Sequence, residues 1–179
     1  MPDARRARFA SPIGVLLLEA QGDRLRGLRM IDDPSDPLLE GAESGAAGPF
    51  LDDVRARLDD YFAERPSRFD LPLLMEGTDF QRRVWGELLK IPHGETISYA
   101  ELARRVGDPK ATRAVGSANG RNPIAVIVPC HRVISADGRL GGFGGGLDRK
   151  LWLLRHEARV VGREAPASWT RGLAPAPYP

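Results

Sequence analysis

From Thr78 onward the chain carries closely spaced signals for the starts and ends of short helices. The stretch TDFQ is a capping box, in which the Thr78 hydroxyl accepts from a free helical amide while Gln81 reaches back. Apolar residues then recur at helical spacing and stop before Pro92. This pattern predicts that the chain from Thr78 to about residue 120 forms short helices joined by tight turns.

Two of these predicted helices form a helix-turn-helix candidate. SYAE, which begins at Ser98, is a second capping box and predicts a helix to about Val106. Gly107 suits the end of that helix, and Asp108 with Pro109 suits the start of the next, which continues through PKATRAVGSANG. Such pairs also occur as ordinary packed helices, so the pattern alone leaves both interpretations open.

The charge of the chain is unevenly distributed although its net value is only +2. Residues 31–60 hold nine acids and two arginines, whereas residues 98–132 hold six lysines and arginines against two acids. A basic segment is often a solvated face. It indicates nucleic-acid binding only where a nucleic-acid-binding fold coincides with it, as the helix pair does here.

The first third of the chain is typical of a small α/β unit. GVLLLEA, the turn QGD and RLRGLRMI predict a hairpin, and apolar spacing from Leu51 predicts a helix to about Glu64. We therefore divide the chain into an N-terminal α/β domain with an antiparallel sheet (1–75), a mainly helical domain (76–160) and a loosely ordered Pro/Ala-rich tail (161–179).

The only cysteine, Cys130, follows the apolar run IAVIV, which is typical of a buried strand. Pro129 ends that run, and His131 places a base beside the thiol. Neighbouring residues of an extended chain point to opposite faces, so thiol and imidazole need a turn or a bridging water to communicate. A lone cysteine is commonly a buried structural thiol, and a nucleophile is the alternative. Lowering a thiol pKa from about 8.5 to about 7 needs about 2 kcal/mol, which a histidine and a helix N-terminus can supply.

Several classes of protein are excluded by composition. One cysteine provides neither an internal disulfide framework nor a multi-cysteine zinc site, and it suits a reducing compartment. The apolar runs have the length of strands rather than of membrane spans. MPDARRARFASP lacks the apolar core of a signal peptide, so we expect a cytoplasmic protein with no membrane association.

PCHRV, preceded by SANGRNP and followed by GGLDRKLWLLRHE, resembles the O6-alkylguanine-DNA alkyltransferase family, also called methylated-DNA–protein-cysteine methyltransferases. The resemblance covers about residues 78–158, beginning at TDFQRRVWGELLKIPHGETISYAELA, while the first 75 residues match only loosely. It implies a ribonuclease-H-like N-terminal domain and a helical domain with a winged-helix-like helix-turn-helix.

The resemblance also implies a function, which is DNA repair by direct and stoichiometric alkyl transfer. Such a protein binds double-stranded DNA through the minor groove, flips the damaged guanine out and moves its O6-alkyl group onto its own cysteine, which inactivates the protein. O4-alkylthymine is a second candidate substrate. A monomer without cofactor or metal is expected.

Individual roles follow from the match of each residue with the family's motif. Cys130 matches the alkyl acceptor, and His131 matches the base that takes the thiol proton through a water. Glu157 matches the carboxylate that orients this histidine. Asn122 matches the asparagine that holds the site's backbone, and Tyr99 the tyrosine that meets the DNA backbone and helps protonate the departing guanine at N3.

The remaining expected site residues contact DNA or line the pocket. Arg113 matches the finger that replaces the extruded base in the stack. The other expected DNA contacts are Lys110, Arg121 and Ser135. The expected lining of the alkylguanine pocket is Val133, Phe143, Gly144 and Gly145. Taken singly, each of these residues also has an ordinary structural interpretation.

The loop GGFGGGL departs from the family pattern, because relatives commonly carry tyrosine at the Phe143 position and serine or alanine at Gly144. The missing side chain predicts a wider pocket that accepts bulkier O6-alkyl groups, and inertness toward O6-benzylguanine would count against this. Two other functions stay open. One is a non-catalytic sensor of DNA damage, a class in which the cysteine is replaced; the other is a cysteine hydrolase, recognised by multiple turnovers.

Overall fold

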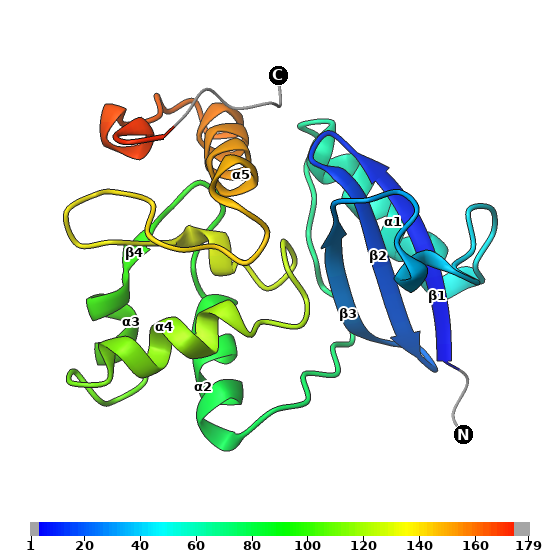
Figure 1. Cartoon of the computed structure of the whole chain (residues 1–179), viewed down its shortest axis with the longest axis horizontal. Helices are drawn as coiled ribbons and strands as arrows, with labels where there is room; N and C mark the ends of the chain where they lie inside the picture. Colours follow the sequence, from blue (N-terminus) through cyan, green and yellow to red (C-terminus); the bar gives the residue numbers. More distant parts are fainter. Residues whose placement is uncertain (1–3, 174–179) are drawn as a thin grey trace. The chain divides into compact units, whose positions relative to one another are not determined.

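The computed structural model describes residues 4–173, which divide into two compact units that we treat separately (Figure 1). The first unit comprises the chain up to Glu76 together with Pro123–Ile127. The second comprises Gly77–Asn122 and the chain from Val128 onward. The short apolar segment before Cys130 thus clusters with the first unit, which its place in the sequence did not indicate.

The first unit is a three-stranded antiparallel meander with one helix packed on it (Figure 1). Its elements, in chain order, are β1 (Ala4–Ser11), β2 (Gly14–Gln21), β3 (Arg24–Ile31), a short 3-10 helix (Pro37–Leu39) and α1 (Pro49–Phe62). The predicted hairpin is β2–β3, and the predicted helix is α1. Strand β1 escaped prediction because arginines dominate its sequence, although Ala7 and Phe9 alternate inward. Phe62 of α1 stacks on Phe9, with ring centroids 6.0 Å apart.

The second unit is mainly helical. Its elements are α2 (Asp79–Leu88), β4 (Ile97–Ser98), α3 (Tyr99–Arg105), α4 (Thr112–Gly120), the 3-10 helix η2 (Cys130–Arg132), β5 (Val133–Ile134), α5 (Leu147–Val160) and the 3-10 helix η3 (Ala167–Thr170). The Thr78 capping box is present, and the Ser98 hydroxyl caps α3. Helix α4 begins at Thr112 rather than near Pro109, because Asp108 closes a turn by accepting from the amide of Lys110.

Helices α3 and α4 pack on each other and on α2, which confirms the predicted helix pair (Figure 1). The two-residue ladder of β4 and β5 is parallel and pairs Ile97 with Val133. Through this ladder the start of α3 is fixed to the chain that directly follows η2, the turn that begins with Cys130. The segment with the only cysteine and the helix pair therefore form one framework.

The prediction of a strand at IAVIV was wrong, although its burial was correct. Ile124 makes only an isolated bridge to Leu28, after which the chain turns. Val126 has φ 69°, a strained value for a β-branched residue, and the amide of Ile127 donates to the carbonyl of Ala125. Hydrophobicity reports burial alone, so a buried turn and a buried strand share the same apolar pattern.

The prediction of a loosely ordered tail does not hold for residues 161–173. Helix η3 lies in this segment, and Trp169 is buried in an apolar cluster. The prediction rested on the Pro- and Ala-rich composition and overlooked one large indole. The burial of this indole stabilises the segment. The rest of the predicted tail, 174–179, lies outside the described residues.

Candidate active site

Cys130 is held at the start of a tight turn. It is only 5% exposed and opens η2, the turn that also contains His131 and Arg132. Pro129 precedes the turn, and the amide of Cys130 donates to the carbonyl of Val128 over 2.8 Å. The 3-10 turn removes the alternation of an extended chain, so the thiol and its neighbouring imidazole no longer have to point to opposite faces.

Two asparagines fix the backbone around the thiol. Asn122 donates from Nδ2 to the carbonyl of Val128 over 2.7 Å, and its side chain also hydrogen-bonds the thiol. Asn119, in the last turn of α4, donates to the carbonyl of Cys130 over 3.2 Å. Asn122 was expected to hold this backbone, whereas Asn119 was missed. The side chain of Asn119 is only 4% exposed, which is unusual for an asparagine. This burial depends on the tertiary structure and cannot be seen in the sequence.

His131 and Glu157 form a buried pair. Nε2 of His131 lies 2.7 Å from Oε1 of Glu157, and both side chains are almost wholly excluded from solvent. Because a carboxylate only accepts, Nε2 must carry the hydrogen, which leaves a lone pair on Nδ1. Nδ1 is buried and has no hydrogen-bond partner among the described residues. The imidazole is therefore in the tautomer that can accept a proton at Nδ1.

Arg132 adds two donors to Glu157, and sequence reasoning missed it. Its Nε donates to Oε2 over 2.8 Å and its Nη2 to Oε1 over 3.0 Å, while Nη1 donates to the carbonyl of Ile91. The amide of Gly94 also donates to Oε2, over 3.2 Å. With four donors the carboxylate has a fixed orientation whether or not His131 is charged. Arg132 is the R of PCHRV, and nothing in that motif indicated a bond to a residue 25 positions further along the chain.

The environment sets the protonation states of these groups. Burial raises the pKa of Cys130, although the hydrogen bond with Asn122 and the charge of Lys150 act in the opposite direction. Burial lowers the pKa of His131 below 6.5 despite the attraction of Glu157. Burial acts to raise the pKa of Glu157, but His131 and Arg132 outweigh it and hold the pKa well below 4.5. The resting site thus contains a neutral thiol, a neutral imidazole and a carboxylate.

The protonation states bear on how the cysteine could be activated. The sequence left open a thiol pKa that neighbours lower toward 7, whereas burial raises the pKa of Cys130. The thiol of the resting protein is therefore protonated. The neutral imidazole beside it has, at Nδ1, the unpaired acceptor that a general base for this thiol would need.

The same pKa shifts predict that acid destabilises the protein from pH 6.5 downward. The unfolded chain protonates His131 near pH 6.5 and Glu157 near pH 4.5, whereas both folded pKa values are lower. The unfolded state therefore binds more protons, and the free energy of unfolding falls as the pH falls. Urea denaturation across this range should show the loss, and His131→Asn should reduce its upper part, to which the half-buried His93 also contributes because burial lowers its pKa as well. Constant stability between the two pH values would contradict the neutral imidazole.

Lys150 binds the backbone of β5 and of the chain around the glycine loop 141–146, and sequence reasoning missed it as well. Its buried Nζ donates to the carbonyls of Val133, Leu140 and Gly142 at 2.6, 2.5 and 3.1 Å. Burial lowers the pKa of Lys150 to about 8, so the ammonium remains the main form at neutral pH. The ammonium also lies 5.8 Å from the centroid of the Tyr99 ring. This one charge joins β5 to the glycine loop 141–146.

Tyr99 lies at the first position of α3, beside this loop. Its hydroxyl donates to the carbonyl of Gly142 over 3.3 Å, and a carbon added at Gly141 would lie 3.0 Å from its ring. Burial raises the pKa of Tyr99, and a thiolate at Cys130 would raise it further, so the phenol keeps its proton. Tyr99 is thereby a protonated donor within electrostatic range of the thiol.

The residues expected to line the pocket differ in burial and in the contacts that they make. Val133 is buried and its carbonyl binds Lys150, while Phe143 is half-buried. A carbon added at Gly144 would lie 3.8 Å from the carbonyl of Gly120, which places the loop near the end of α4. Gly145 accepts from the guanidinium of Arg149 through its carbonyl. The loop therefore lies between α4 and the start of α5.

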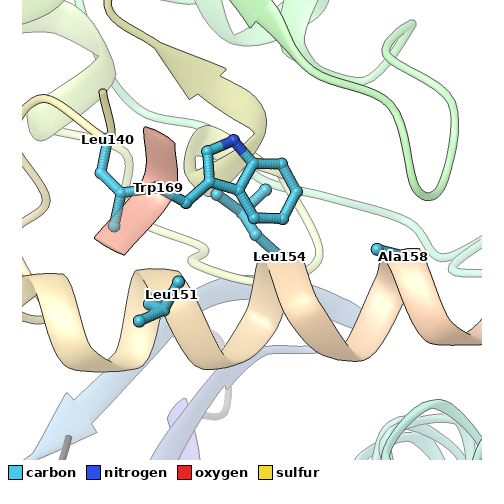
Figure 2. Close-up of a cluster of buried hydrophobic side chains, with 5 residues drawn as sticks. All are labelled: Leu140, Leu151, Leu154, Ala158 and Trp169. Carbon is cyan, nitrogen blue, oxygen red and sulfur yellow. The ribbon is translucent and has the colours of Figure 1, made fainter. Parts of the chain in front are cut away.

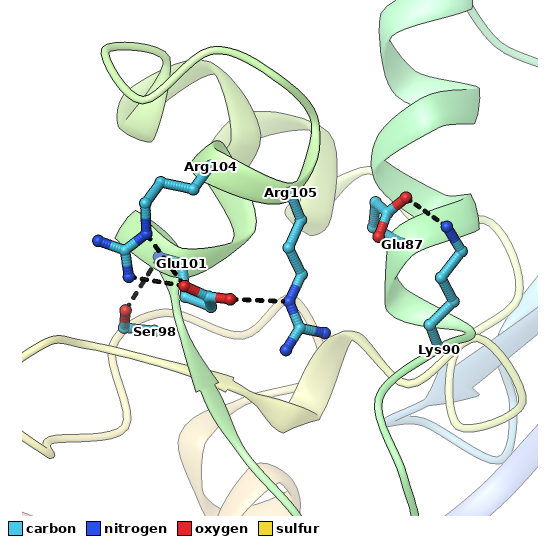
Figure 3. Close-up of polar contacts among 6 residues, drawn as sticks. All are labelled: Glu87, Lys90, Ser98, Glu101, Arg104 and Arg105. Carbon is cyan, nitrogen blue, oxygen red and sulfur yellow. Dashed lines mark hydrogen bonds and ion pairs between the residues drawn. The ribbon is translucent and has the colours of Figure 1, made fainter.

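Charge on the helix pair is concentrated on fewer residues than its composition suggests. Glu101 binds both Arg104 and Arg105, as Figure 3 shows, and Arg132 is buried against Glu157. In contrast, Lys110, Arg113 and Arg121 are exposed and form no ion pair within the described part of the chain. These three are the basic residues expected to contact DNA. Ser135, the other expected contact, is half-buried beside Gly141.

Other kinds of site are not evident in the described chain. Among residues 4–173, no group of three or more His, Cys, Asp or Glu is placed to hold a metal ion. Within the same residues, no helix is both long and apolar enough to cross a bilayer.

Comparison with known proteins gives the same family over both units. The model of the 6-O-methylguanine DNA methyltransferase ribonuclease-like domain matches residues 5–75, and that of the DNA-binding domain matches residues 79–159. A methylated-DNA–protein-cysteine methyltransferase of Mycobacterium leprae is 53% identical over 153 residues, covering 84% of this chain and 90% of that protein. One from Methanosarcina acetivorans is 46% identical over 157 residues, covering 84% and 96%.

Solved structures agree with this assignment. The crystal structure of Mycobacterium tuberculosis O6-methylguanine methyltransferase is 47% identical, with a TM-score of 0.77, and the match covers 92% of this chain and 96% of that one. The same TM-score and coverage apply to Mycobacterium tuberculosis OGT in complex with DNA, at 48% identity. The two matched domains, the identities and the fold lead to one conclusion: this chain belongs to the 6-O-methylguanine DNA methyltransferase family.

Proposed function

We propose that the protein repairs O6-alkylguanine in DNA by moving the alkyl group onto Cys130, once per molecule. The observation that carries this proposal is the buried Glu157–His131 pair directly beside the only cysteine. Family membership supplies the substrate class, and the named relatives are methylated-DNA–protein-cysteine methyltransferases. A thioether has no hydrolytic exit comparable to that of an ester, so the alkylated protein is not regenerated.

The proposed reaction is an in-line displacement at the alkyl carbon. Nδ1 of His131 takes the thiol proton through a water, and the sulfur then forms a bond to the carbon as the bond from carbon to O6 breaks. The electron pair of that bond stays with the guanine. Tyr99, whose phenol is protonated, donates toward N3 as negative charge develops on the base. His131 then releases the proton that it took and Tyr99 regains its own, both through water, so the net change is one proton from the thiol to the guanine and the reaction is balanced.

Binding to DNA is proposed to use the exposed helix pair. The complex of the Mycobacterium tuberculosis relative with DNA supports a DNA-binding role for this fold. We place α4 at the duplex in the minor groove, with Arg113 filling the gap left by the flipped nucleotide. A guanidinium plane can recover part of the lost stacking, whose cost is a few kcal/mol. We expect the protein to act as a monomer, with O4-alkylthymine as a second substrate.

The direct test is the intact mass of the protein after mixing with a duplex that carries one O6-methylguanine. A gain of one methyl group, saturating at one per molecule and mapping to Cys130, is expected. Tight binding to the lesion without any gain would indicate a damage sensor. Repeated turnover on an ester or amide, with no stable adduct, would indicate a hydrolase. Either outcome would overturn the proposed transfer.

The pairing of charges predicts which basic residues determine the salt dependence of DNA binding. Lys110→Ala or Arg121→Ala is expected to weaken binding to DNA of any sequence and to lower the slope of log K against log salt by about 1. Arg104→Ala is the matched control. Its slope should change less, because Glu101 already neutralises this guanidinium over 2.6 Å. Equal changes in slope for the three variants, measured by fluorescence anisotropy, would contradict this assignment.

A further inference from the structure

The chain after α5 folds back onto that helix instead of leaving the unit. The amide of Arg163 donates to the carbonyl of Ala158, and η3 then brings Trp169 over the helix. Figure 2 shows the indole lying above Leu154 and Ala158, beside Leu140. Ser168 passes the turn before Leu140 so closely that a carbon added at Gly138 would lie 3.1 Å from its Oγ.

The glycine loop 141–146 has little structure of its own to hold it. Five of its six residues are glycine, and Gly141 and Gly146 have φ of 71° and 90°. A single backbone bond, from the amide of Gly146 to the carbonyl of Phe143, lies within it. Its position must therefore depend on contacts from outside the loop, which are the side chains that bind Gly142 and Gly145 and whatever holds its two ends.

Both ends of this loop are anchored in the cluster that Trp169 covers. Leu140, which precedes the loop, is only 3% exposed and belongs to the cluster. Leu147, which follows the loop, and Ile134 of β5 pack against the same cluster. Trp169 comes from outside this run of sequence and is the largest side chain of the cluster (Figure 2). Its removal would open a void at the base of the loop.

A displacement of Leu140 would reach the reactive groups through one buried charge. Lys150 binds the carbonyls of Leu140, Gly142 and Val133 together, and the Tyr99 hydroxyl binds Gly142 as well. Val133 directly follows the turn that contains Cys130. Leu140, the glycine loop and Tyr99 are thus joined by successive hydrogen bonds.

We infer that residues 165–173 form a C-terminal strap, and that Trp169 is a positioning residue which sets the glycine loop and thereby the size of alkyl group accepted. This inference rests on the proposed function, in which the loop is one wall of the alkylguanine pocket. The indole does not touch the reacting atoms. It acts through Leu140, so its effect should appear in rate and selectivity more than in DNA affinity.

The test compares Trp169→Ala with the natural protein on two substrates, a duplex with O6-methylguanine and free O6-benzylguanine. Methyl transfer is expected to slow by about 10-fold to 100-fold, because small misplacements of a positioned group are costly. Benzyl transfer should slow less, since a loosened wall admits the larger group, so the benzyl-to-methyl rate ratio rises. The dissociation constant for the methylated duplex should stay within a factor of about three, a change of less than 1 kcal/mol.

Loss of stability alone is separated by matched variants. Leu153→Ala removes a fully buried side chain of α5 that lies outside the cluster, and its rate ratio should not change. Trp169→Leu keeps an apolar side chain of smaller reach and should give an intermediate ratio, which also serves if Trp169→Ala fails to fold. If the wild-type protein transfers the methyl group and the Trp169 variants keep its benzyl-to-methyl rate ratio, the inference is overturned. Failure of wild-type transfer would instead overturn the proposed function.

Discussion

Cys130→Ser is expected to bind O6-methylguanine duplex DNA with unchanged affinity and to transfer no methyl group. The serine hydroxyl is nearly isosteric and can keep the hydrogen bond with Asn122. Its oxygen is a far weaker nucleophile, and the neutral imidazole of His131 is too weak a base to ionise it. Incubation for hours, followed by intact mass and peptide mapping, measures the transfer, and a gel-shift titration measures affinity.

Cys130→Ala is the companion variant, since it removes both the nucleophile and the hydrogen bond to Asn122. It should also transfer nothing, and the difference in thermal stability between the two variants would report the hydrogen bond together with the burial of the hydroxyl. Because the chain holds one cysteine, methyl transfer by either variant would require a nucleophile of another residue type. Such transfer would contradict the assignment of Cys130.

Glu157→Gln is expected to slow methyl transfer by about 100-fold to 10,000-fold, the range associated with the loss of an oriented general base. An amide oriented either way places its NH2 group against donors, which are His131 and Arg132 at one position and Arg132 and Gly94 at the other. Where the NH2 group faces Nε2 of His131, Nε2 must accept, so the hydrogen moves to Nδ1 and Nδ1 can no longer take a proton. The uncompensated Arg132 should also cost about 3 to 5 kcal/mol of folding free energy.

The pH profile separates this role from simple loss of stability. In the natural protein the rate should fall on the acid side of pH 6.5, as His131 becomes protonated below its ordinary pKa. Glu157 acts to raise that pKa, so its removal should move the acid limb to lower pH as well as lower the rate. Glu164→Gln, an exposed carboxylate beyond the same helix, should change neither property. A rate within a factor of about three of wild type would contradict the relay.

Local sequence signals predicted the elements whose ends depend on near neighbours. The capping residues Thr78 and Ser98 start α2 and α3, and the QGD turn joins β2 to β3. These signals act across a few residues and therefore survive without the fold. The same reasoning failed at Pro109, where the side chain of Asp108 closes a turn and delays α4.

The site was predicted in part, and the missing part consists of contacts between distant residues. The family resemblance indicated Cys130, His131 and Glu157, and the fold brings the last two within hydrogen-bond distance. It gave no reason to select Arg132, Asn119 or Lys150, since a buried arginine, asparagine and lysine look like surface residues in sequence. Only their burial makes them essential donors, because a buried charge must be paired or hydrogen-bonded.

The sequence by itself determined the family, the helix pair and the chemical type of the nucleophile, because caps, turns and motifs are properties of adjacent residues. The tertiary structure decided how the thiol is used. Burial raises the pKa of Cys130 and lowers that of His131, which is why the proposed activation uses a neutral base. It also decided that Trp169 covers the anchor of the glycine loop. Burial and contacts across the chain depend on all elements at once, so no local pattern of residues contains them.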